Sequence, residues 1–252
     1  MKNFKFLVIS ILPIMWLIYF LFEFFTGRIN SSTIVIGNLL LIILFTLIGY
    51  IIYKLSLSFD SGFNKKNLFI IFLILMLLDQ GSKIIIHFYY FNENIILIKN
   101  FLSFSPIINT DGSWLNARFG TGISFPLLIL TNFIALFLFI EVYKYYISKN
   151  KKDFWSDMCF VFMFSGALCS LIDKVFYGGS LDFIGIGDLF VADIKDIYIN
   201  LGILFFVALM FKSGVLTSED TSSFKEDMQS IKRFFNFIKS DIQNIFKKKK
   251  DI

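Results

Sequence analysis

The sequence holds few of the side chains that most catalytic centres use. Its 252 residues include one histidine and two cysteines. One histidine excludes an HExxH zinc site, which needs two. A nucleophile activated by histidine would depend on His87 alone, which lies between Ile86 and Phe88 with no acid beside it. Acid–base chemistry in this chain is therefore expected from carboxylates or lysines.

Charged residues are also scarce. They make up 17% of the chain, against about 25% in soluble domains. Hydrophobic residues make up 56%, aromatic residues 19%, and the mean hydropathy is +0.72. This balance excludes a cytosolic enzyme, a nucleic-acid-binding domain and a disordered chain, and it predicts an integral membrane protein. The net charge of +5 is interpreted as lysines that face a membrane surface.

The two cysteines are too far apart to pair. Cys159 and Cys169 lie in one apolar run, and on a helix their separation is about 15 Å of rise. A disulfide needs a much shorter distance between the two backbones. We interpret both as small apolar packing residues.

Six apolar runs are long enough to cross a bilayer. They are residues 4–25, 33–57, 67–90, 123–147, 158–177 and 190–211. The stretch 91–122 is too polar for lipid, and residues 178–189 are predicted to form a glycine-rich loop. Most basic residues outside these runs fall on one side of the six-span arrangement, so both termini are predicted to be cytoplasmic. The polar stretch and the glycine-rich loop then face outward.

The chain divides into three parts on this basis. Residues 1–60 form a two-span N-terminal extension, residues 61–212 a four-span core, and residues 213–252 a basic tail. In the tail, apolar residues such as Ile231, Phe235 and Ile242 recur at helical spacing between lysines. This pattern predicts an amphipathic helix that lies on the anionic inner leaflet.

Acidic residues within the spans are the candidates for function, because an ionisable group in a membrane helix is costly. Asp79 and Lys83 are four residues apart and share a helix face, so they can neutralise each other. Asp173 lies about 17 residues into the fifth span, or roughly 26 Å along it, and Asp193 lies near the start of the sixth.

Asp173 and Asp193 should therefore reach a similar depth, just inside the outer interface. Gly166 and Ser170 precede Asp173 on one helix face and allow a close approach to a neighbouring helix. Two carboxyls that meet there would share a proton. This is the arrangement of an aspartic protease, in which one carboxylate takes a proton from water and the other acid polarises the carbonyl.

Five segments of the chain resemble, in order and spacing, the motifs of lipoprotein signal peptidase (signal peptidase II). They are LDQGSK at 78–83, NTDGSW at 109–114, GALCSLIDK at 166–174, GSLDFI at 179–184 and FVAD at 190–193. The resemblance covers residues 67–212. It implies an all-α polytopic membrane protein with a four-helix core, to which this chain adds an N-terminal two-helix hairpin. A small outward-facing β and loop element is also implied.

The resemblance also implies an activity. Members of this family are aspartic endopeptidases of the bacterial inner membrane that cut diacylglyceryl-modified prolipoproteins before the lipid-bearing cysteine. Water is the attacking group, with no metal or cofactor. The implied partners are prolipoprotein signal peptides and membrane lipids, not nucleic acid, and the implied active site lies at the outer face of the membrane.

The resemblance assigns roles to individual residues. Asp173 and Asp193 would be the catalytic pair. The residues that would support the site or hold substrate are Asp79, Lys83, Asn109, Gly112, Trp114, Ser170 and Lys174.

Three positions near the pair depart from the family pattern. Ser170 and Val191 stand where the family has asparagine, and Lys174 stands where it has arginine. In the second motif the glycine, Gly112, is displaced by one position. Lysine lacks the planar two-pronged contact that arginine makes.

Three other readings remain open from the sequence. The chain could be a non-catalytic member that binds lipidated peptides or a membrane partner. Residues 185–188 spell GIGD, a pattern of other intramembrane aspartic proteases, although here it falls in the predicted outward loop. The third reading is an ion or proton conductor that uses Asp79, Asp173 and Asp193.

Overall fold

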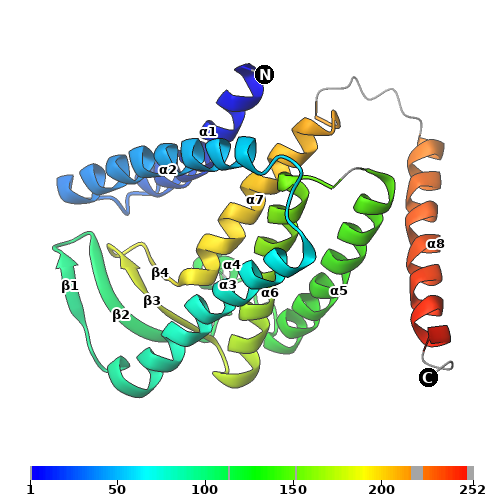
Figure 1. The fold of residues 1–252 in the computed structure, drawn as a ribbon. Helices are drawn as coiled ribbons and strands as arrows, with labels where there is room; N and C mark the ends of the chain where they lie inside the picture. Colours follow the sequence, from blue (N-terminus) through cyan, green and yellow to red (C-terminus); the bar gives the residue numbers. More distant parts are fainter. Residues whose placement is uncertain (1, 113, 151, 217–223, 249–252) are drawn as a thin grey trace.

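Helices form most of the protein. The computed structural model describes residues 2–112, 114–150, 152–216 and 224–248. Six helices in these ranges are long and apolar enough to cross a membrane. They are α1 (Lys2–Phe25), α2 (Ser32–Ser58), α3 (Lys65–Ile85), α5 (Phe125–Lys149), α6 (Phe154–Phe176) and α7 (Ile194–Lys212). The predicted polytopic α fold is confirmed, and Figure 1 shows α1 and α2 as a hairpin beside the other four spans.

Glycines let α6 and α7 approach closely at the centre of the bundle. A Cβ added at Gly166 would lie 2.8 Å from Ile199 of α7, and one at Gly202 would lie 2.5 Å from Met163 of α6. Such distances leave no room for a larger residue without a shift of the neighbour. The small-residue face predicted on the fifth span therefore sets the spacing between the two helices that carry Asp173 and Asp193.

Two helices begin at capping residues rather than where the apolar runs begin. The side chain of Asp153 caps α6, so this helix begins four residues before the predicted 158. Asp193 caps α7 in the same way, so the prediction of a helix from 190 is wrong. Residues Phe190–Ala192 form strand β4 instead. In both cases a carboxylate that satisfies the first free amides fixes the start of the helix.

A small antiparallel sheet lies at one end of the bundle. Its strands, in the order β1-β2-β3-β4, are β1 (Ile95–Ile98), β2 (Leu102–Asn109), β3 (Ser180–Ile186) and β4 (Phe190–Ala192). A π-helical turn, η1 (Ile86–Tyr90), follows α3, and a short helix, α4 (Trp114–Phe119), follows β2. The predicted polar stretch therefore supplies β1, β2 and α4.

The prediction of a glycine-rich loop over 178–189 is wrong for most of its length. Residues Ser180–Ile186 form β3, which pairs with β2 on one side and β4 on the other. Leu181 and Phe183 are buried against Ile86. Central pairing and this burial stabilise an extended chain, and a left-handed backbone occurs on either side of the strand, at Gly178 and at Gly187.

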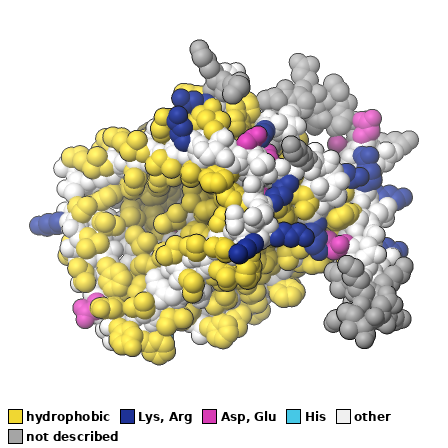
Figure 2. Space-filling view, in the orientation of Figure 1, with side chains coloured by type: hydrophobic (Ala, Val, Ile, Leu, Met, Phe, Trp, Pro, Cys, Tyr) yellow, Lys and Arg dark blue, Asp and Glu magenta, His cyan; other side chains and the backbone are white. Residues whose placement is uncertain are grey.

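The C-terminal tail forms helix α8 (Phe224–Lys248), as its apolar spacing predicts. It contacts α5, where Tyr145 lies with its ring centroid 5.3 Å from that of Phe234. Lys144 of α5 also pairs with Asp241 of α8 at 2.7 Å. Figure 2 shows hydrophobic side chains over the broad left-hand face, hollowed near its centre, and most of the visible Lys and Arg side chains toward α8. The two cysteines are free.

Candidate active site

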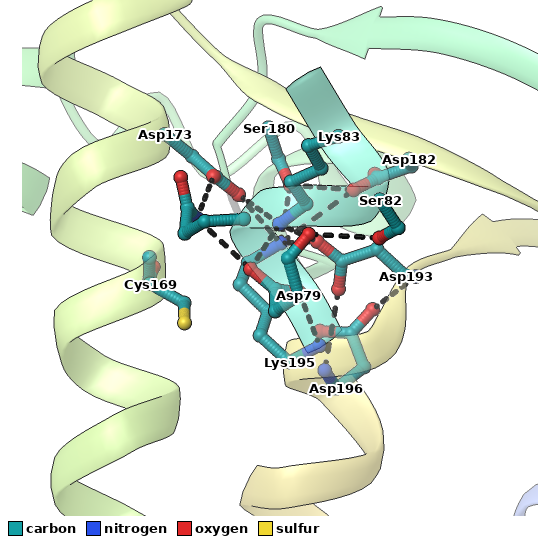
Figure 3. A network of polar contacts seen from close by, with 12 residues as sticks. Asp79, Ser82, Lys83, Cys169, Asp173, Ser180, Asp182, Asp193, Lys195 and Asp196 are labelled. Atoms are coloured by element: carbon teal, nitrogen blue, oxygen red, sulfur yellow. Dashed lines mark hydrogen bonds and ion pairs between the residues drawn. The ribbon is translucent and has the colours of Figure 1, made fainter. Parts of the chain in front are cut away.

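Acidic side chains from three spans converge at the end of the bundle that adjoins the sheet (Figure 3). Asp79 comes from α3, Asp173 from the last turn of α6, and Asp193 from the N-terminus of α7. All three side chains have no exposed surface, and neither does Lys83. Buried charges are stable only when they are paired, so the contacts among these four groups determine what the site can do.

The Lys83 ammonium lies at the centre of the cluster. Its Nζ is 2.9 Å from Asp79 Oδ2, 2.6 Å from Asp173 Oδ2 and 2.5 Å from Asp193 Oδ2. Asp79 and Lys83 meet across one turn of α3, as their spacing predicts. Since one nitrogen touches both other carboxylates, Asp173 and Asp193 lie side by side at the junction of α6 and α7.

Asp193 is held in one orientation by its position as a helix cap. Its Oδ1 accepts a hydrogen bond from the backbone N–H of Asp196 at 3.2 Å, and Asp196 Oδ2 accepts one from the backbone N–H of Asp193 at 3.2 Å. This leaves Asp193 Oδ2 directed into the cluster. The amide groups at a helix N-terminus stabilise a carboxylate there.

A second lysine, Lys195, also lies between the two carboxylates. Its Nζ contacts Asp193 Oδ2, and it lies 3.2 Å from Asp173 Oδ2 and 3.6 Å from Asp182 Oδ1. Its backbone N–H donates to Asp79 Oδ1 at 2.9 Å, so α7 is joined to α3 through the same residue. Burial would raise the pKa of the Asp193 carboxyl, but Lys195 and Lys83 outweigh burial and hold that pKa below its ordinary value.

The contact between the two carboxylates therefore differs from the shared proton expected from the sequence. Two ammonium groups, those of Lys83 and Lys195, connect Asp173 to Asp193. The positive charge that the sequence-based expectation lacked comes from Lys195, which lies two residues after Asp193 in the chain. The same two carboxylates meet, but in this structure they are bridged by cations.

Gln80 fixes the remaining oxygen of Asp173. The Gln80 amide donates to Asp173 Oδ1 at 3.0 Å and to Asp79 Oδ2 at 2.9 Å. Asp173 therefore has one oxygen held by an amide and the other by lysines. Such fixed partners keep a side chain in a single orientation.

Asn109 reaches the cluster through Asp182 of β3. Its amide donates to Asp182 Oδ2 at 3.0 Å, and Ser180 donates to Asp182 Oδ1 at 2.5 Å. Burial raises the pKa of the Asp182 carboxyl, and the nearby Lys195 offsets this only in part. Asn109 thus adjoins the site through Asp182 rather than through Asp173 or Asp193.

One group of carboxylates in the described residues has the spacing of a cation site. Asp182, Asp193 and Asp196 each place an oxygen within 4.8 Å of the others. The Lys195 ammonium, however, already contacts Asp193 and lies 3.6 Å from Asp182. The positive charge that a metal would supply at this point therefore comes from the chain itself.

Ser170 and Lys174, predicted to hold substrate, pair with each other; Ser170 lies three residues before Asp173 and Lys174 directly follows it. The Lys174 Nζ donates to Ser170 Oγ at 2.7 Å, and the Asn132 amide of α5 donates to the same oxygen at 3.0 Å. Both side chains are largely buried. They line the α5 side of the site, and their hydrogen bonds run to each other rather than to the acid cluster.

The remaining predicted residues lie in the segment after β2. Gly112 has φ of +67°, and a Cβ there would lie 2.9 Å from Leu128, so this turn requires glycine. The side chain of Trp114 lies outside the described residues, although its backbone begins α4. Asp188 of the GIGD pattern is exposed in the turn between β3 and β4 and does not join the cluster.

Comparisons with known proteins agree with this architecture. Residues 71–212 match the family described as signal peptidase (SPase) II. A solved structure described as a bacterial membrane enzyme aligns with a TM-score of 0.51 and 20% identity, over 66% of this chain and 99% of that one. A second structure with the same description gives a TM-score of 0.49 and 19% identity, over 60% and 96%. No curated protein matches the chain in sequence.

Proposed function

The chain belongs to the signal peptidase II family, and we propose that it is an aspartic endopeptidase that cleaves signal peptides from diacylglyceryl-modified prolipoproteins. Family membership supports a lipoprotein signal peptidase function in general terms. Together with the six membrane-span helices, it indicates a multi-pass protein of the bacterial inner membrane. The catalytic pair and the substrate are the parts that this proposal adds.

The observation that carries the proposal is the meeting of Asp173 and Asp193. The two buried side chains come from the facing ends of α6 and α7, and both touch the Lys83 nitrogen. Two carboxyl groups that contact the same nitrogen are close enough to act as the general base and the general acid when water attacks a peptide bond. Lys83 contacts both carboxylates and Gln80 holds Asp173, and such fixed partners keep catalytic side chains in the productive orientation.

Asp193 is the better candidate for the base. The α7 N-terminus and two ammonium groups all favour its ionised form. In the proposed reaction Asp193 takes a proton from water, whose oxygen attacks the scissile carbonyl carbon. Asp173 serves as the acid, which in its protonated form donates a proton to the carbonyl oxygen. The C–N bond then breaks as the nitrogen takes the proton that Asp193 removed from water, and one hydroxyl of the intermediate returns its proton to Asp173. A carboxyl group and a free amine result.

The proposed orientation follows the distribution of basic residues. With both termini in the cytoplasm, the acid cluster and the sheet face outward, near the depth at which a lipid-modified cysteine would lie. The sheet and α4 would then cover the peptide. The exposed apolar side chains of the spans contact membrane lipids.

A cleavage assay tests this function directly. Purified protein in detergent micelles is incubated with a prolipoprotein carrying a diacylglyceryl group and, separately, with the same precursor without lipid. We expect cleavage of the lipid-modified precursor alone, with the new N-terminus at the modified cysteine when the product is analysed by mass spectrometry. A folded preparation that leaves the lipid-modified precursor intact, where a standard family member cleaves it, would refute the proposal.

A non-catalytic role is the second candidate, and one observation favours it. Ser170 and Lys174 occupy positions where the family has side chains with a larger hydrogen-bonding capacity, and here they bond to each other at 2.7 Å. Fewer donors are then left to orient a peptide. In this case the protein would bind the lipid-modified precursor in the same assay, measured by co-purification, without cutting it.

A further inference from the structure

A buried carboxylate near the end of α1 connects the N-terminal hairpin to the segments around the site. Glu23 has no exposed surface. Its Oε2 lies 3.2 Å from the Arg28 guanidinium, and its Oε1 lies 3.5 Å from Arg118 Nε. Arg28 belongs to the connection between α1 and α2. Arg118 belongs to α4, which follows β1 and β2 in the sequence.

Arg28 extends the connection to the turn between β3 and β4. Its Nη2 donates to the backbone carbonyl oxygens of Asp188 at 2.6 Å and Leu189 at 2.8 Å. The strand after this turn leads directly to Asp193. The Arg28 guanidinium therefore joins Glu23 to the turn before β4, and β4 is followed directly by Asp193, a proposed catalytic residue.

Arg118 makes the matching connection from α4. Its guanidinium lies 5.4 Å from the ring centroid of Phe22 in α1, and its Nη2 lies 3.5 Å from Thr26 Oγ1. The ring of Phe119 lies 6.3 Å from that of Phe22. The short helix after β2 is thus packed against the end of α1 by both charge and aromatic contacts.

The hairpin also packs on the sheet by apolar contacts. The Phe190 ring of β4 lies edge-on to Tyr19 at 5.4 Å and near Trp16 at 6.2 Å. A Cβ added at Gly37 of α2 would fall 2.3 Å from the Phe101 ring, so that ring lies directly on the α2 backbone. Figure 1 shows the hairpin alongside the sheet.

We propose that Glu23 is a positioning residue that ties the N-terminal hairpin to the cover of the site, defined here as α4 and the turn at residues 187–189. The proposal rests on the function proposed above. Glu23 touches the two arginines and not the acid cluster, whose members are held by α3, α6 and α7. Loosening the cover should therefore weaken the binding of the lipid-bearing peptide and leave the chemical step unchanged.

Hydrogen exchange tests the connection without any need for activity. Replacing Glu23→Gln leaves two arginines beside a neutral amide. We expect backbone amides of residues 114–119 and 187–192 to exchange about 10-fold faster, or about 1.4 kcal/mol in local opening free energy. Amides in α6 should be unaffected. Glu93→Gln, which changes an exposed acid in the loop before β1, is the matched control and should exchange like the wild type.

Two variants, each of which removes one of the two arginines that pair with Glu23, distinguish a positioning role from a general loss of folding. Arg118→Met should accelerate exchange in α4 alone, and Arg28→Met should accelerate it in residues 187–192 alone. Both side chains are partly exposed, at 25% and 32%, so each change should be tolerated. Unchanged exchange in both segments, or equal acceleration over the whole chain, would overturn the inference.

Kinetics then test the effect on substrate. We expect Glu23→Gln to raise KM for the lipid-modified precursor about 10-fold with kcat within about twofold of the wild type. A fall in kcat at unchanged KM would contradict the proposed role in binding. If the wild type cleaves nothing, the proposed function fails, whereas the exchange experiment still decides whether Glu23 holds the cover.

Discussion

The most informative single change is at Lys195, because this residue places a positive charge beside both proposed catalytic carboxylates. Lys195→Met keeps most of the side-chain volume and removes the charge. The variant loses contacts with Asp193, Asp173 and Asp182. Two unit charges about 3 Å apart interact by about 5 kcal/mol at an effective dielectric constant of about 20, which is an upper limit here because Lys83 and water compensate.

The expected result is a shift of the acidic limb of the pH–rate profile. Lys195 holds the pKa of Asp193 below its ordinary value, so the wild type keeps its base ionised to low pH. Loss of a neighbouring cation typically changes a carboxyl pKa by about 1–3 units. We expect the pH at which kcat/KM is half-lost on the acid side to rise by about 1–3 units in Lys195→Met.

The assay is cleavage of the lipid-modified precursor across the acid range, with folding checked by thermal unfolding in micelles. Lys195→Arg keeps the charge and should give a profile close to that of the wild type. An active Lys195→Met enzyme whose profile superimposes on the wild-type profile would refute this reasoning, and so would a shift of the acidic limb to lower pH.

Three further changes test the packing and charge around the site. Gly166→Val should press on Ile199, destabilise the protein by about 1–3 kcal/mol in unfolding experiments, and lower the cleavage rate by moving α6 from α7; an unchanged rate would contradict the close-packing argument. Asp157→Asn, at the other end of α6, removes an acceptor from the Phe63 amide and should cost about 1.5–3 kcal/mol with cleavage retained. Burial raises the pKa of Asp182, so wild-type stability should fall as pH rises above about 3.9; Asp182→Asn should flatten that slope, and an equal slope in both proteins would contradict the assignment.

Much of the fold could be predicted because the chain has long apolar runs. Run length alone locates all six membrane-span helices to within a few residues at most ends. The starts of α6 and α7 are the exceptions. Asp153 and Asp193 cap these helices, and the position of a capping residue cannot be inferred from where an apolar run begins. An aspartate followed three residues later by Ser156 or Asp196 is the signal that would have found both starts.

Strand β3 could not be predicted from local composition. Gly185 and the flanking Gly178, Gly179 and Gly187 favour a loop. What makes the segment a strand is pairing with β2, more than 70 residues earlier in the chain, together with burial of Leu181 and Phe183. Such non-local pairing leaves no local pattern. The alternation of apolar Leu181 and Phe183 on either side of Asp182 is the one local hint of a strand.

The acid cluster could be predicted in part. Asp79, Lys83, Asp173 and Asp193 were found because ionisable groups are rare in spans. Lys195 was missed, because helical periodicity does not apply across a cap whose backbone is extended, with φ of −135° and ψ of −176° at Asp193. The shared proton was expected without the cation that this lysine supplies.

The roles of Asp173 and Asp193 are tested most directly by removing each carboxylate in turn. The measurement is the initial rate of cleavage of the lipid-modified precursor by Asp173→Asn and Asp193→Asn, with Asp188→Asn as a control at an exposed acid in the nearby turn. All three proteins must be shown to insert and fold. We expect the first two to be slower by about 10²–10⁴-fold and the control to match the wild type. Cleavage at the control rate by both cluster variants would contradict the assignment of this acid pair as the catalytic centre.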